Sequence, residues 1–134
     1  MLSQAFVTTP GQTYLAAFTF GNYSPSGLAR TQQVIASAIN TSNSALLNSV
    51  TANDSVTGTQ TTFPALMGTS YSFFFTATGT QTTLQFADQP ASQTTFSDGL
   101  LDNVSVVAVP ESGTLALLLP ALGVVGAVVL RRKK

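Results

Sequence analysis

The sequence contains no histidine, no cysteine and no tryptophan, and only 7% of its 134 residues are charged. Without histidine and cysteine the chain cannot build a cysteine nucleophile, a thiol redox pair, a zinc finger or a histidine-based catalytic triad. We therefore expect no enzymatic activity, no metal and no cofactor. Hydroxyl-bearing side chains are abundant instead, with 14 serines and 20 threonines. This composition is typical of exported β proteins.

The formal net charge of zero conceals an uneven distribution of charge along the chain. Four of the five cations are the last four residues, Arg131, Arg132, Lys133 and Lys134. Residues 1–113 carry a net charge of −4, from one cation, Arg30, and the five acids Asp54, Asp88, Asp98, Asp102 and Glu111. A nucleic-acid-binding surface needs several cations to neutralise phosphates, so we expect no nucleic-acid partner.

An uncharged apolar run of 17 residues, Thr114–Leu130, precedes the basic end. As a helix it would span roughly 25 Å, close to the lower limit for crossing a hydrocarbon core about 30 Å thick. We predict a transmembrane helix over 114–130 that contacts the lipid bilayer. Because cations stay on the cytoplasmic side, residues 131–134 would lie inside and residues 1–113 outside. A buried core helix is the alternative, although such a helix is seldom apolar on all sides.

The amino terminus does not match this orientation. Export of a domain this long normally requires a signal peptide with a basic region and 7–15 apolar residues, and residues 1–14 contain neither. We expect Met1 to be an internal residue of a longer natural precursor. The alternative is an export route that the sequence does not reveal.

Residues 1–108 are predicted to form one exported, mainly β domain. Apolar and polar side chains alternate in Thr13–Phe20 and in Thr69–Thr78, which is the period-2 pattern of half-buried strands. Shorter candidate strands are Val34–Ile39, Ala45–Val50, Thr82–Phe86 and Val104–Val109. Turn signals between strands include Gly21-Asn22, Asn53-Asp54, Gly79 and Asp98-Gly99. This spacing predicts an antiparallel β-sandwich of jelly-roll type, although the alanines and glutamines of Thr31–Ile39 also permit a short helix there.

Residues 109–134 resemble a PEP-CTERM sorting signal. Val109-Pro110-Glu111-Ser112, the apolar run and the terminal Arg-Arg-Lys-Lys follow its order of a Pro-Glu-Pro motif, a hydrophobic helix and a basic end, with Ser112 in place of the usual third proline. The resemblance implies that a membrane-embedded exosortase recognises Pro110, Glu111 and Ser112 and removes the helix. A Pro-Glu pair that ends a strand and begins a helix is the structural alternative.

The domain resembles galactose-binding-like jelly rolls of the choice-of-anchor type. The segments that carry this resemblance are Ser3-Gln4-Ala5-Phe6, Pro10-Gly11-Gln12-Thr13-Tyr14, Phe18-Thr19-Phe20-Gly21-Asn22 and the closing Gly99-Leu100-Leu101-Asp102-Asn103-Val104-Ser105-Val106. Such domains usually carry further strands before the first of these segments. The resemblance therefore implies an incomplete jelly roll, in agreement with an amino-terminal truncation.

Few residues of the domain are candidates for a site. Tyr23, in a Gly-Asn-Tyr-Ser-Pro segment, is the best candidate for stacking on a sugar ring, whereas Phe73 and Phe75 are expected in the core with Phe74 facing the other side. Asp98 and Asp102 are too few to complete a calcium shell of six to eight oxygens.

Three functions remain open. The leading hypothesis is a non-enzymatic surface or extracellular-matrix protein of a Gram-negative-type bacterium, sorted by an exosortase and associated with exopolysaccharide. The alternatives are a carbohydrate-binding module displayed in the same way and a simple single-pass inner-membrane protein. A glycosidase with paired carboxylates has little support, because the five acids are scattered along the chain.

Overall fold

The computed structural model describes residues 1–23, 30–56, 68–89 and 98–110. Its regular structure in these ranges consists of strands, namely β1 (Leu2–Val7), β2 (Thr13–Tyr23), β3 (Arg30–Asn40), β4 (Leu46–Val56), β5 (Thr69–Thr76), β6 (Gln81–Gln89) and β7 (Asp98–Ala108). None of the described ranges holds a helix that could cross a membrane. The predicted span over 114–130 lies outside them, as do Glu111, Ser112 and the basic residues 131–134.

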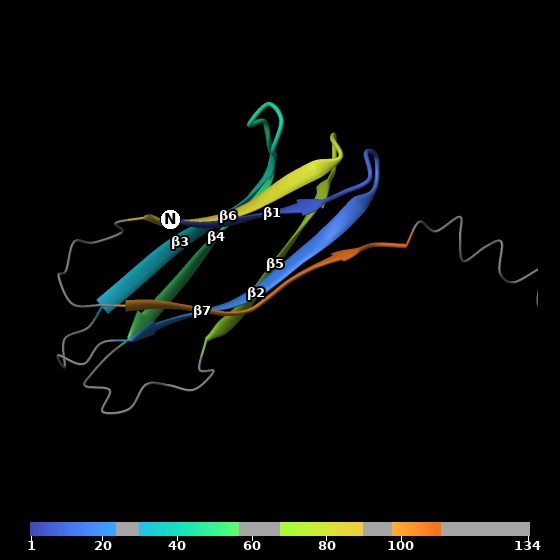
Figure 1. Ribbon diagram of the computed structural model, residues 1–134. Helices are drawn as coiled ribbons and strands as arrows, with labels where there is room; N and C mark the ends of the chain where they lie inside the picture. Colours follow the sequence, from blue (N-terminus) through green and yellow to red (C-terminus); the bar gives the residue numbers. More distant parts are fainter. Residues whose placement is uncertain (24–29, 57–67, 90–97, 111–134) are drawn as a thin grey trace, which may run out of the picture.

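The strands form two antiparallel sheets that pack face to face (Figure 1). One sheet has the order β1-β6-β3-β4 and the other the order β5-β2-β7. The hairpin of β3 and β4 is the one place where consecutive described strands are neighbours in a sheet, since all other connections pass from one sheet to the other. The predicted antiparallel β-sandwich is therefore confirmed, and the helix alternative for Thr31–Ile39 is wrong.

The alternating segments fold as their pattern predicts. Ala16, Phe18 and Phe20 of β2 are buried, and so are Phe73 and Phe75 of β5, whereas the residues between them face outward. Three predicted turns are wrong, because Gly21-Asn22 lies within β2, Asn53-Asp54 within β4 and Asp98-Gly99 at the start of β7. Local turn propensity gives way there to the ladder hydrogen bonds of long strands.

Aromatic rings join the two sheets in the core. The Phe18 ring stacks on the Tyr71 ring, with ring centroids 5.7 Å apart. It also contacts the Phe86 ring, which belongs to the other sheet, in a T-shaped arrangement with a centroid distance of 5.1 Å. Tyr14 stacks on Phe75 at 5.5 Å. Small residues lie opposite these rings, since Ala36, Ala38 and Ala52 are fully buried. The alternation of large and small side chains lets the two inner faces interdigitate.

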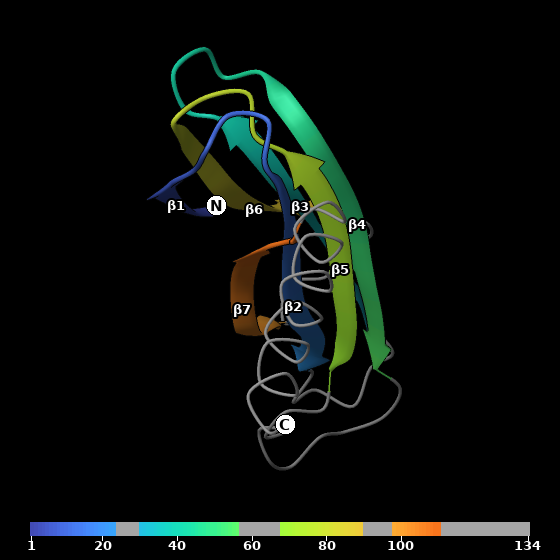
Figure 2. The ribbon, with the colours of Figure 1, turned by 90° about the vertical axis from the view of Figure 1, so that its right-hand side faces the viewer.

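The two long flanks of the sandwich differ. Along the closed flank, β4 and β5 lie side by side (Figure 2) and hydrogen bonds cross from one sheet to the other. The Tyr71 hydroxyl donates to the backbone oxygen of Asn53 at 2.6 Å and accepts its N–H at 3.1 Å, and Asn48 Nδ2 donates to the backbone oxygen of Phe74 at 2.7 Å. The open flank lies between β1 and β7, which pair with β6 and β2 respectively.

Candidate functional site

One candidate site lies on the outer surface of the three-stranded sheet, which we call the β2 face. Its outward side chains follow from the alternation of β5, β2 and β7, and hydroxyls dominate among them. The face comprises Ser70, Ser72, Phe74 and Thr76 of β5, Thr13, Leu15, Ala17 and Thr19 of β2, and Asp102, Ser105 and Val107 of β7.

Phe74 is the exposed aromatic residue of this face. Its side chain is 55% exposed, although both neighbours in sequence are buried. The strand register places Phe74 opposite Leu15 and Leu15 opposite Val107, so a short apolar row crosses the sheet. The Asn48 amide holds the backbone oxygen of Phe74 from the neighbouring sheet. The ring therefore stands on a rigid strand rather than on a loop.

Hollows flank the Phe74 row on both sides. One has a volume of about 410 Å³ and is lined by Phe74, Thr76 and Thr13 together with Leu46, Leu47 and Asn48 of β4. The other, of about 400 Å³, is lined by Leu15, Ala17, Ser70, Ser72 and Asn103. Asn103 has a φ of 51°, and the pairing of β2 with β7 is irregular between Ala17 and Thr19. This irregularity places an amide side chain at the rim of the second hollow.

The chemistry of the β2 face suits binding rather than acid–base catalysis. A ring with hydroxyl groups on both sides can contact the apolar face of a ligand while the hydroxyls bond to its edges. Asp102 is its one carboxylate among the described side chains, and its Oδ1 accepts the N–H of Asn103 at 2.7 Å. No group of three metal-ligating side chains occurs within the described ranges.

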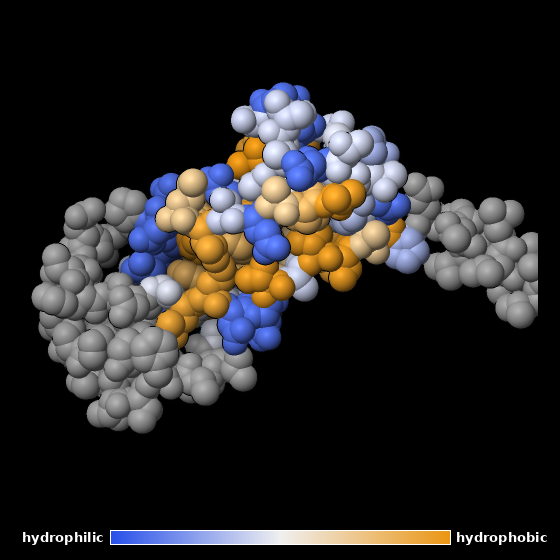
Figure 3. All heavy atoms as spheres, in the orientation of Figure 1, coloured by the Kyte–Doolittle hydropathy of each residue, from blue (hydrophilic) through white to orange (hydrophobic). Residues whose placement is uncertain are grey.

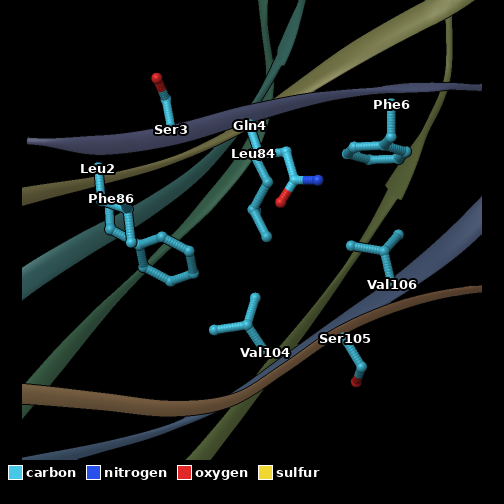
Figure 4. A pocket seen from close by; sticks show the side chains of 9 residues that line it. All are labelled: Leu2, Ser3, Gln4, Phe6, Leu84, Phe86, Val104, Ser105 and Val106. Atoms are coloured by element: carbon cyan, nitrogen blue, oxygen red, sulfur yellow. The ribbon is translucent and has the colours of Figure 1, made fainter.

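A separate hollow, which we call the β1–β7 groove, lies on the open flank of the sandwich. It has a volume of about 360 Å³ and is lined by Leu2, Ser3, Gln4, Phe6, Leu84, Phe86, Val104, Ser105 and Val106. Val104 and Val106 project from β7 into the groove, whereas the side chains of Ser3 and Ser105 turn away from it (Figure 4). Hydrophobic residues gather on this side of the molecule (Figure 3). The groove thus exposes side chains of the inner faces of the sheets.

Comparison with known proteins supports the fold. No protein-family model and no curated protein matches the sequence. A solved structure described as "CBM4 structure and function", a carbohydrate-binding module, aligns with a TM-score of 0.51 at 16% identity. The chain has a CBM-like β-sandwich fold. The alignment covers 80% of this chain and 59% of that structure, so the chain spans less than two thirds of its length.

The CBM-like sandwich separates the residues that the sequence singled out. The backbone of Tyr23 ends β2 opposite Asp98 of β7, but the side chains of both lie outside the described part of the structure. Asp102 is exposed further along β7. Pro110 is exposed just beyond β7, and Val109 still donates its N–H to Thr13 O at 2.9 Å. The last described residues therefore leave the domain from the outer edge of its smaller sheet.

Sequence reasoning did not assign Phe74 to a site, although it correctly placed the residue on the outer side. The signal was present in the sequence, because successive side chains of a strand point to opposite faces of the sheet, so Phe74 faces outward when Phe73 and Phe75 face the core. An exposed phenylalanine amid serines and threonines makes this surface a candidate for contact with the apolar face of a ligand. The sequence analysis chose Tyr23 instead, because a turn was expected there, whereas its backbone belongs to β2.

Proposed function

We propose that the β domain is a non-catalytic carbohydrate-binding module. The observation that carries the proposal is the exposed Phe74 ring, rigidly held on β5 and flanked by hydroxyl-lined hollows. The CBM-like fold supports the proposal at the level of architecture. A pyranose would pack its C–H face on the ring, and its hydroxyls would bond to serine and threonine side chains.

The charge of the domain favours neutral polysaccharides as ligands. Residues 1–113 carry a net charge of −4, and the outward row of Phe74, Leu15 and Val107 is uncharged. A polymer rich in uronate, sulfate or phosphate would be repelled by this field at low salt.

Affinity electrophoresis against a panel of neutral and acidic polysaccharides tests the proposal. We expect the full chain, solubilised in a neutral detergent, to bind at least one neutral polysaccharide. Phe74→Ala should weaken that binding about tenfold, since an aromatic contact contributes on the order of 1.4 kcal/mol. Phe74→Tyr should retain binding, and Val7→Ala, remote on β1 and 83% exposed, should not change it. No binding to any polysaccharide, or equal binding by Phe74→Ala, would refute the proposal.

We further propose that residues 109–134 sort the protein to the cell surface or extracellular matrix through an exosortase. The exposed Pro110 directly after β7 supports this, because a sorting protease needs an extended and accessible segment. The order of motif, apolar run and basic end in the sequence supports it as well. In this proposal the bilayer holds the protein before processing.

Processing in an exosortase-containing host tests the sorting proposal. Pro110→Ala and Glu111→Ala should each leave the unprocessed form in the inner membrane, as judged by fractionation and intact mass. Ser112→Pro, which restores the usual motif, should be processed at least as well as the natural sequence. Normal processing of both alanine variants would count against an exosortase. A natural sequence that keeps its tail in the membrane would instead favour a simple single-pass protein.

A further inference from the structure

The hollow that contains Ala17 lies at the centre of the β2 face, and we call it the Ala17 hollow. The strand registers place Ala17 between Ser72 of β5 and Ser105 of β7. Ala17 is smaller than Leu15 and Thr19, its outward neighbours along β2, so the surface sinks at this point into a hollow of about 400 Å³. This volume lies within the range of small-ligand pockets, so the hollow can receive a substituent of a sugar ring.

The two walls of the Ala17 hollow differ in polarity. One wall is the apolar row that crosses the sheet, formed by Phe74, Leu15 and Val107. The other wall is polar and is formed by Ser70, Thr19 and Asp102. Diagonal neighbours on a sheet lie about 7–8 Å apart, so a group carried by a ring that stacks on Phe74 reaches Ala17. A group that fits between these walls has both an apolar part and a hydrogen-bonding part.

The polar groups around the Ala17 hollow are available to a ligand. Within the part of the chain that the structure describes, no hydrogen bond involves the hydroxyls of Ser70, Ser72 and Thr19 or the side-chain amide of Asn103. A hydroxyl both donates and accepts, and an amide carries a donor and an acceptor. These side chains can therefore bond to a ligand group that has a donor, an acceptor or both.

The polar groups of the hollow on the other side of Phe74 are already paired. The Thr13 and Thr76 hydroxyls bond to each other, with their oxygens 3.2 Å apart. Asn48 Nδ2 donates to the backbone oxygen of Phe74 at 2.7 Å, and its Oδ1 accepts the N–H of Ser49 at 2.9 Å. A ligand would compete with these bonds, which lowers the net gain from new ones. The Ala17 hollow is therefore the better site for polar recognition next to the ring.

We propose that the β2 face binds N-acetylated amino sugars, with the sugar ring on Phe74 and the acetamido group in the Ala17 hollow. The inference rests on the proposed carbohydrate binding and names the class of sugar. In this arrangement the acetamido methyl packs against Ala17 and Leu15. The carbonyl oxygen accepts from the Asn103 amide, and the N–H donates to a serine hydroxyl. Each part of the group thus meets the wall that matches it.

Other sugar substituents match the Ala17 hollow less completely. A hydroxyl group, as in an unmodified hexose, leaves the apolar row without a contact. The methyl group of a deoxy sugar fills the hollow but bonds to none of the hydroxyls. A carboxylate is repelled by Asp102, which is exposed at the polar wall. The acetamido group combines an apolar and a hydrogen-bonding part without charge, which selects it among these substituents.

Calorimetric titration of the full chain in a neutral detergent with chitotetraose and with cellotetraose tests the inference. The two oligosaccharides share backbone and linkage, but chitotetraose carries an acetamido group where cellotetraose carries a hydroxyl. We expect chitotetraose to bind about tenfold more tightly, since one hydrogen bond and one buried methyl group together are worth at least that factor. Phe74→Ala should weaken the binding of both.

Variants of the hollow test where the acetamido group lies. Ala17→Val fills the hollow with a side chain that suits a strand, and should make the two affinities nearly equal. Asn103→Gly removes the amide, while glycine accepts the positive φ of 51° at this position. This variant should lower the preference for chitotetraose about threefold. Ala5→Val is the matched control and should keep the full preference, since Ala5 is exposed on β1 of the other sheet.

The outcomes separate this inference from the proposed function. Chitotetraose binding no tighter than cellotetraose, or an undiminished preference in Ala17→Val, would overturn the inference. Carbohydrate binding would still stand in that case if Phe74→Ala binds more weakly. Failure to bind chitotetraose, by a chain that binds another neutral polysaccharide, would also overturn the inference alone. Binding to no carbohydrate would refute both.

Discussion

The space between the two sheets is closed by hydrogen bonds along one flank of the sandwich and is open along the other. On the closed flank, polar side chains at strand edges reach the backbone of the other sheet: Tyr71 bonds to Asn53, Asn48 bonds to Phe74, and Asp54 Oδ2 accepts the N–H of Asn22 at 2.7 Å. On the open flank, no hydrogen bond joins β1 to β7 within the residues that the structure describes, and apolar side chains face the gap. A flank closed by specific bonds is complete, whereas an apolar open one is suited to receive a further element.

This difference also bears on where the proposed carbohydrate site lies. Phe74 is held by a bond of the closed flank and stands on a rigid surface, which suits recognition of a stiff ligand with little cost in entropy. The β1–β7 groove has apolar walls, and no described strand pairs with the outer edges of β1 and β7. The Phe74 surface and the β1–β7 groove therefore lie on different parts of the smaller sheet, and one can be altered without the other.

The largest loss of stability is expected for a substitution of Phe18, which lies where the core links both flanks. The Phe18 ring is 2% exposed and contacts Tyr71 on the closed side and Phe86 on the groove side. Phe18→Ala should lower the free energy of unfolding by about 3–5 kcal/mol, because it leaves a cavity between the sheets. Urea denaturation followed by circular dichroism measures this. A loss below about 1 kcal/mol would mean that the two sheets are not joined through this ring.

A smaller loss of stability is expected when a hydrogen-bonding group of the closed flank alone is removed. Tyr71→Phe removes the hydroxyl that bonds to both backbone groups of Asn53, and should cost about 1–2 kcal/mol of unfolding free energy. Tyr14→Phe is the matched control, since its hydroxyl accepts a single bond, from the Thr9 N–H at 2.9 Å, within one end of the molecule. Equal losses in the two variants would show that the bonds to Asn53 do not stabilise the flank specifically.

Sequence patterns predicted most of the sandwich but not the difference between its flanks. The alternation in Thr13–Phe20 and Thr69–Thr78 identified β2 and β5, whose inward aromatic residues form much of the core, because burial of one face imposes period 2. Alternation did not predict β1, since Leu2–Val7 is mostly exposed; only the resemblance to jelly-roll strands pointed to Ser3-Gln4-Ala5-Phe6. The bonds of Asn48, Tyr71 and Asp54 depend on contacts between distant segments, which local propensity does not encode. The hollows beside Phe74 were unpredictable for the same reason.

The smallest loss of stability is expected for a substitution at the rim of the open flank. Leu2→Ala should change the unfolding free energy by less than about 0.5 kcal/mol, because 62% of the side chain is already exposed and little area leaves water on folding. Leu84→Ala is the matched control within the same groove wall: its side chain is 5% exposed, so its loss should reach about 2–3 kcal/mol. Thermal and urea unfolding of the lipid-free full chain distinguish the two. If both substitutions cost the same, Leu2 is buried in solution and the open flank is closed near β1.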